Sequence, residues 1–167
     1  MAEILRGFQW LYNTDGSQQM VLNLPVKISQ TLYRGNVVNL SYTSGSIRVA
    51  AEGETALYGV ILHSKSTTAT QVTARADVVP FTVNAVFQVK GAPSTMTTLS
   101  EKFRAYPADL EIPTTGYHRV DTGAATLHFR IVGWPNSTSD ASGAGRKWHV
   151  TIMPTAAAFQ GTRNIAT

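Results

Sequence analysis

The chain has 167 residues, of which 43% are hydrophobic and only 14% are charged; its formal net charge is +4 and it has no cysteine. This composition excludes disulfide scaffolds, thiolate zinc sites and cysteine nucleophiles, and it argues against helical bundles, whose outer faces need Glu and Lys. The length is that of one domain with an arm or an insertion, and no apolar run approaches the roughly 18 residues that span a bilayer.

The first eighteen residues differ from the rest of the chain. They contain a dense apolar group, part of it at helical spacing, followed by a turn signal at 13–17. The apolar residues are Ile4, Leu5, Phe8, Trp10, Leu11 and Tyr12. So short a segment is not stable alone, so it packs either on its own domain or on a neighbouring subunit. We predict an N-terminal arm over 1–18 and keep both docking partners open.

From residue 19 onward, short predicted strands are separated by Gly, Ser, Asn and Pro. Pro25 divides two apolar runs, which indicates a break or an edge strand. A strand at 36–42, a turn at 43–46 and a second strand at 47–50 predict a hairpin.

The next apolar run covers 57–62, and Gly59 inside it indicates a bulge or a close backbone approach. Residues 70–75 and 81–85 alternate between apolar and polar side chains, which predicts two half-buried strands.

The second half of the chain contains one long segment of weak periodicity, 91–113, which we predict to be an insertion loop. Clear alternation returns at 126–131 and at 147–152. Residues 155–167 form a tail of small residues. The β domain is therefore expected to cover 19–154.

Many short strands at near-regular spacing predict an all-β fold. We expect a small barrel or sandwich of short antiparallel strands with an N-terminal arm and one long insertion loop. The sequence does not distinguish the barrel from the sandwich.

The histidines are the first residues to test for chemistry. His128 and His149 lie on the polar faces of two strands that we expect to pair, and His118 and Asp121 precede them. No dense ligand spacing such as H-E-x-x-H accompanies them, so we interpret them as partly exposed strand histidines. The chain also lacks a G-x-S-x-G elbow and a phosphate-binding loop. We expect no catalytic residue, no cofactor and no metal.

Charged side chains are scattered. Most basic residues occur singly, without the stripe of cations and aromatics that is typical of nucleic-acid binders, so we expect no nucleic-acid partner. Glu52 and Glu54 occupy a turn and are interpreted as solvated charges. The pattern favours a protein that holds a shape and contacts another protein.

Segment 34–62 carries a succession of short motifs. Residues 34–40 read RGNVVNL, residues 45–53 read GSIRVAAEG and residues 58–61 read YGVI. This succession resembles the core of tailed-bacteriophage head decoration proteins, in which a G-[DN]-x-V-x-L strand precedes a G-x-[IV]-x-x-A strand and a G-V strand. Asn36 stands where Asp is common in that family.

The resemblance implies a non-enzymatic cement protein that binds the outside of an expanded capsid, often as a trimer. The expected partner is the major capsid protein, and the expected location is the outer surface of the virion after synthesis in the host cytoplasm. No catalytic or contact residue is carried over. Instead, the apolar N-terminal residues named above are the predicted capsid or subunit contacts, since aromatic side chains dominate interface hot spots. We expect no membrane partner.

Other functions also fit the sequence. The chain could be another phage structural subunit from a shell, tail or baseplate. It could also be a carbohydrate-binding β-sandwich that stacks sugars on a tryptophan. The candidates for that platform are Trp10, Trp134 and Trp148. Trp134 is the best of them because it adjoins a predicted loop. An enzyme that uses His118, Asp121 and His128 is the last alternative.

Overall fold

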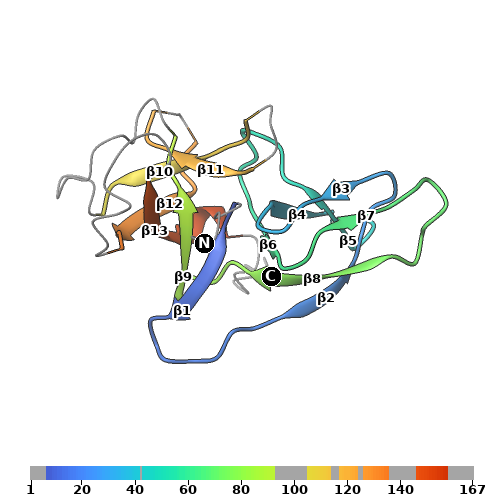
Figure 1. Cartoon of the computed structure of the whole chain (residues 1–167), viewed down its shortest axis with the longest axis horizontal. Coiled ribbons are helices and arrows are strands. Elements are labelled where there is room, and N and C mark those ends of the chain that lie inside the picture. The colour runs from blue at the N-terminus through green and yellow to red at the C-terminus, as the bar shows by residue number, and fades with distance from the viewer. Residues whose placement is uncertain are drawn as a thin grey trace, which may run out of the picture.

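The structure is a computed structural model, and it describes residues 7–41, 43–92, 105–113, 117–123, 126–135 and 146–157. The fold of these residues is all-β, as the sequence predicts. The strands form a six-stranded sheet, a five-stranded sheet and a two-stranded ribbon. The two larger sheets lie side by side along the long axis of the molecule (Figure 1).

The first sheet has the order β1-β9-β13-β12-β10-β11, and its neighbours are antiparallel. Its strands are β1 (Gln9–Asn13), β9 (Ala85–Lys90), β10 (Pro107–Glu111), β11 (Arg119–Asp121), β12 (Phe129–Gly133) and β13 (Lys147–Ile152). The sheet curls until the residues after β9 meet β11. Gly91 forms a parallel bridge with Val120, and the N–H of Ala92 donates to the carbonyl of Val120 at 2.7 Å. These bonds close five of the strands into a small barrel, to which β1 is added beside β9.

The second sheet has the order β2-β8-β6-β4-β5 and curls in the same way. Its strands are β2 (Leu22–Pro25), β4 (Val37–Ser41), β5 (Ser46–Val49), β6 (Gly59–Ile61) and β8 (Arg75–Pro80). Val26 bridges Ile47 in parallel, and the N–H of Lys27 donates to the carbonyl of Ile47 at 2.9 Å. The ribbon pairs β3 (Thr31–Leu32) with β7 (Lys65–Ser66), and a 3-10 turn covers Pro154–Ala156.

Three strands of the second sheet are buried on both faces. Their inward side chains, in the core of the second sheet, are Val38, Ile61 and Val78. Their outward side chains, in the core shared with the first sheet, are Val37, Val60 and Val79. A strand with one wet face alternates apolar and polar residues, whereas burial of both faces requires consecutive apolar residues. This is why the sequence has apolar pairs in β4, β6 and β8.

Aromatic rings fill the region where the two sheets meet. Phe8 lies 5.0 Å from Phe129 between ring centroids, and Phe81 lies 5.0 Å from Phe87 and 5.4 Å from Phe129. Edge-to-face and tilted arrangements of this kind add to the burial of apolar area. The predicted alternation at 147–152 is confirmed in β13, since Trp148, Val150 and Ile152 on one face of the strand are buried.

Several predictions of local structure are confirmed. The strand at 36–42 and its hairpin correspond to β4 and β5. Pro25 is the last residue of β2, and β2 stands at one end of the strand order of the second sheet. Gly59 marks a close backbone approach. A Cβ there would lie 2.9 Å from the Cα of Pro80 and closer still to the carbonyl oxygen of Val79.

Other predictions are wrong. The helical spacing in the N-terminal segment misled, because residues 9–13 form strand β1; this strand pairs with β9 of the first sheet, so this part of the segment packs on its own domain, one of the two docking partners left open. Segment 91–113 is not all loop, since it contains β10; residues 93–104 lie outside the described part.

The predicted strands at 70–75 and 81–85 are mostly turns, and β8 and β9 begin at the last residue of each. Alternation of apolar and polar residues also occurs in loops whose side chains pack on a nearby core, as the buried Phe81 does. Within the tail 155–167, residues up to Ala157 are described; Ala156 is buried and its carbonyl accepts the N–H of Leu57 at 2.7 Å.

Candidate functional site

The first question is where the predicted contact residues of the N-terminal segment lie. Ile4 and Leu5 are outside the described residues. Phe8 is only 3% exposed and belongs to the chain's own core, and its N–H donates to the carbonyl of Gly35 at 2.8 Å. Phe8 is therefore not available as a partner contact, and for this residue the prediction is corrected.

The other three residues lie in β1. Trp10 and Leu11 are half-buried, and the indole Nε1 of Trp10 donates to the side chain of Asn13 at 3.2 Å. Tyr12 is 48% exposed. Of the predicted contacts that the structure describes, Tyr12 is the one whose ring faces solvent.

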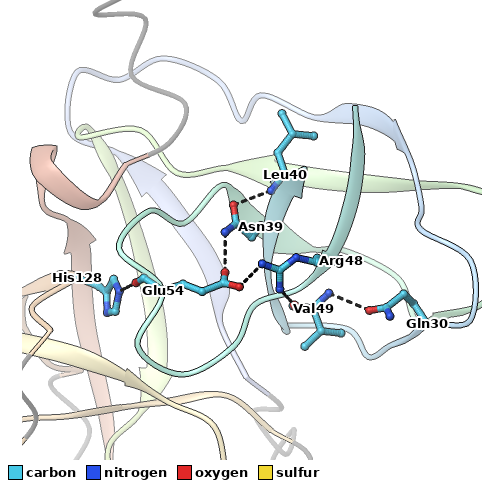
Figure 2. Close-up of polar contacts among 7 residues, drawn as sticks. All are labelled: Gln30, Asn39, Leu40, Arg48, Val49, Glu54 and His128. Atoms are coloured by element: carbon cyan, nitrogen blue, oxygen red, sulfur yellow. Dashed lines mark hydrogen bonds and ion pairs between the residues drawn. The ribbon is translucent and has the colours of Figure 1, made fainter. Parts of the chain in front are cut away.

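An extended polar group lies between the two sheets, around Glu54, in the loop between β5 and β6 (Figure 2). Its carboxylate forms an ion pair with Arg48 of β5 and accepts a hydrogen bond of 2.6 Å from the side-chain amide of Asn39 of β4. Asn39 in turn accepts the N–H of Leu40 at 2.7 Å. We call Asn39, Arg48, Glu54, Asp109 and His128 the junction network.

The backbone of Glu54 extends this network to the first sheet. Its carbonyl oxygen accepts a hydrogen bond from Nε2 of His128, as Figure 2 shows, and Nδ1 of the same ring contacts the carboxylate of Asp109. The side chain of Asp109 also accepts the N–H of Leu110 at 2.6 Å. His128 is fully buried and Asp109 nearly so. A single imidazole thus joins the loop of one sheet to strand β10 of the other.

The chemistry of the His128–Asp109 pair follows from these partners. A carbonyl oxygen only accepts, so Nε2 carries the proton of its hydrogen bond, while Nδ1 contacts the carboxylate of Asp109. Both ring nitrogens are therefore occupied by the protein itself. Because a buried carboxylate without a partner is costly, the pair acts as a polar cross-link.

A second buried histidine makes another link between the sheets. Nδ1 of His118, just before β11, accepts the N–H of Val37 at the start of β4 at 2.9 Å. Burial lowers the pKa of His118 from 6.5 to about 4. An acceptor nitrogen carries no proton, so the hydrogen bond and the burial both favour the neutral ring.

The predicted exposure of these histidines is wrong, because His118 and His128 are both buried. His128 and His149 also do not meet, although β12 and β13 do pair. His149 lies opposite Gly133, and Ile152 lies opposite the residue that follows His128. His149 is half-buried, and burial lowers its pKa. In the described ranges, no three His, Asp or Glu side chains are grouped as metal ligands would be.

Glu54 also differs from its prediction as a solvated charge, since it is part of the junction network, whereas Glu52 is exposed as predicted. Glu54 and His128 are 74 positions apart, so no local pattern could have identified this contact. The one local signal was a carboxylate three positions before the apolar run at 57–62.

The structure also shows where two of the candidate sugar-stacking tryptophans, Trp134 and Trp148, lie. Trp148 is fully buried, and Trp134 is half-buried with its ring 5.9 Å from that of Trp148 in an edge-on arrangement. Trp134 therefore packs on the core of the first sheet.

The short loop after β1 is held by hydrogen bonds to the carboxylate of Asp15. Hydrogen bonds from the hydroxyl of Ser17 at 2.7 Å, from its N–H at 3.0 Å and from Asn84 at 3.0 Å lower the pKa of Asp15. These bonds tie the loop to the turn before β9.

Comparison with models of known protein families and with curated proteins finds no match for this chain. Among the residues that the structure describes, no helix is long and apolar enough to cross a bilayer.

Proposed function

We propose that this chain is a non-enzymatic structural protein of a phage virion, a decoration protein that binds the outer surface of an expanded capsid. The observation that supports the proposal most is the placement of segment 34–62, which carries the resemblance. Its three motifs correspond to β4, β5 and β6, which lie in the order β6-β4-β5 within one sheet. The motifs are thus parts of one continuous structural unit.

The glycine of the third motif has a physical role in that unit. Gly59 of β6 packs directly on the backbone of β8, where a Cβ would collide with Val79 and Pro80. A G-V strand at this position is therefore a packing requirement of the curled sheet.

The architecture suits a protein whose task is to bind and to keep its shape. Each larger sheet closes on itself through a parallel bridge, which limits the unpaired edges that lead to aggregation. The junction network and His118 hold the two sheets together with groups that are satisfied within the chain. We interpret the buried His128–Asp109 pair as structural for the same reason.

The test is co-sedimentation of the full chain with expanded heads of the encoding phage that lack this protein, titrated to saturation. We expect saturable binding at a stoichiometry that matches the capsid lattice, and a copy number in multiples of three if the bound form is a trimer. Heads that already carry the native protein are the control and should take up none.

Two results would reject the decoration role. One is the absence of saturable binding to the undecorated heads. The other is assembly of the purified chain by itself into shells or tubes under the electron microscope, which would assign it to another class of virion subunit.

A further inference from the structure

The end of the second sheet that lies far from the first sheet is formed by two segments, 26–30 and 66–75, which we call the distal tip. In Figure 1 these connections, between β2 and β3 and between β7 and β8, project at the right of the view. They are bonded to each other: the N–H of Val26 donates to the carbonyl of Ala74 at 2.8 Å, and the N–H of Ser29 donates to that of Thr68 at 3.4 Å. The distal tip is therefore one surface.

The first loop of the distal tip is held in a strained conformation. Thr67 is buried, and its hydroxyl donates to the carbonyl of Lys27 at 2.8 Å and accepts the N–H of Gln30 at 2.9 Å. Between them, Ser29 has φ of 55°, a region that costs a residue with a side chain on the order of 1 kcal/mol. This clamp leaves Ile28 39% exposed.

The second loop exposes another apolar side chain. Val72 is 73% exposed, more than any other large hydrophobic residue in the described segments. Its N–H donates to the carbonyl of Thr70 at 3.1 Å, and Gln71 accepts the N–H of Thr68 at 3.0 Å, so local hydrogen bonds fix the loop. Because the loop is already ordered, a partner that covered Val72 would not have to order it first.

The charges of the distal tip indicate the chemistry of that partner. Lys27 and Arg75 are exposed, and neither 26–30 nor 66–75 contains an Asp or a Glu. Asp77, two residues beyond the tip in β8, accepts a hydrogen bond of 2.7 Å from the side chain of Asn23. The guanidinium of Arg75 is positioned by its Nε, which donates to the side chain of Asn23 at 2.6 Å. The two segments also contain no aromatic residue on which a base could stack, which favours a protein over a single-stranded nucleic acid.

We propose that the distal tip is the docking face of this protein for an acidic protein surface. Ile28 and Val72 make the apolar contacts, and Lys27 and Arg75 provide the electrostatic attraction. This inference rests on the proposed function, in which the acidic surface is the outside of the capsid. It places the contact face on loops of the second sheet instead of on the N-terminal segment.

The experiment compares two charge-matched double variants of the full chain for binding to expanded heads that lack the protein. The tip variant is Lys27→Glu with Val72→Ser. The control is Arg130→Glu with Val132→Ser on β12, where both side chains are also exposed. We expect the tip variant to bind at least about ten-fold more weakly and the control to bind within about two-fold of the wild type. Raising the salt concentration should weaken head binding by the wild type more than head binding by the tip variant.

Folding and function are separated by further measurements. Both variants should melt close to the wild type; if the tip variant does not, Val72→Ser alone replaces it, since Val72 is mostly exposed. If the wild type binds heads and the tip variant binds equally well, the docking face is wrong while the proposed function stands. If the wild type does not bind heads, the proposed function is rejected. The capsid is then also rejected as the acidic partner of the distal tip.

Two other outcomes would overturn the inference. Wild-type binding to a mixed-sequence DNA duplex that is lost in Lys27→Glu would assign the distal tip to nucleic acid. A wild-type oligomer that becomes a monomer in the tip variant, measured by analytical ultracentrifugation, would assign the tip to a second copy of the chain.

Discussion

Nδ1 of His118 accepts the backbone N–H of Val37 at 2.9 Å, and this bond joins the residue before β11 in one sheet to the first residue of β4 in the other. The bond requires an unprotonated nitrogen. Burial lowers the pKa of the same ring to about 4, so this contact between the sheets is present when the imidazole is neutral.

This relationship predicts an acid-sensitive contribution to stability. Because the pKa of His118 is lower in the fold than its ordinary 6.5, the unfolded chain takes up this proton first as the pH falls. The contribution is complete above pH 6.5 and is lost progressively as the pH falls towards about 4, by about 3 kcal/mol in total. Urea unfolding between about pH 7.5 and about pH 4 measures it.

The matched control is His118→Asn, whose side-chain oxygen also accepts a hydrogen bond but does not titrate in this range. The free energy of unfolding of this variant should depend less on pH than that of the wild type by the same amount. Equal pH dependence of the two proteins would show that His118 is not the group responsible.

Two glutamates two positions apart should respond differently to the same substitution. Glu54→Gln removes the charge that pairs with Arg48, and we expect a loss of about 1–2 kcal/mol in the free energy of unfolding. Glu52 is exposed, so Glu52→Gln should change stability by less than about 0.5 kcal/mol. Chemical denaturation of both variants tests this, and equal effects would argue against the junction network as a stabilising group.

Two glycines in strands also form a matched pair. Gly59→Ala places a Cβ against the backbone of β8, so we expect a loss of about 1–3 kcal/mol or failure to fold. A Cβ at Gly133 in β12 has no atom within 4 Å, so Gly133→Ala should be neutral or slightly stabilising. Thermal melting of both variants is the measurement, and a stable Gly59→Ala variant would contradict the close packing of β6 on β8.

The N-terminal segment offers a test of core against surface. Phe8→Ala removes a buried ring from the aromatic cluster and should cost about 3–5 kcal/mol. Tyr12→Ala, at an exposed position of β1, should cost less than about 1 kcal/mol. If Phe8→Ala proves as stable as Tyr12→Ala, residues of this segment do not belong to the core. Deletion of 1–18 would remove Phe8 and β1 together, so it tests stability and not binding alone.

The alternation of apolar and polar residues predicted a strand correctly where only one face of that strand is fully buried. In β13 every second residue is buried, so its alternation was a reliable guide. The turns at 70–75 and 81–85 alternate as well, but they lack a neighbouring strand to pair with over most of their length. β10 was missed because it begins at a proline and contains two acidic residues, Asp109 and Glu111, all of which are uncommon in strands.

The sequence by itself determined the all-β class, the β4–β5 hairpin and the special role of Gly59, because strand alternation, turn residues and a missing Cβ act over a few neighbouring positions. Only the tertiary structure decided that Phe8 is core, that the sheets close through Val26–Ile47 and Gly91–Val120, and that His128 meets Asp109 and Glu54. These contacts join residues far apart in the chain. Their geometry depends on how the two sheets curl, and that property belongs to all the strands together.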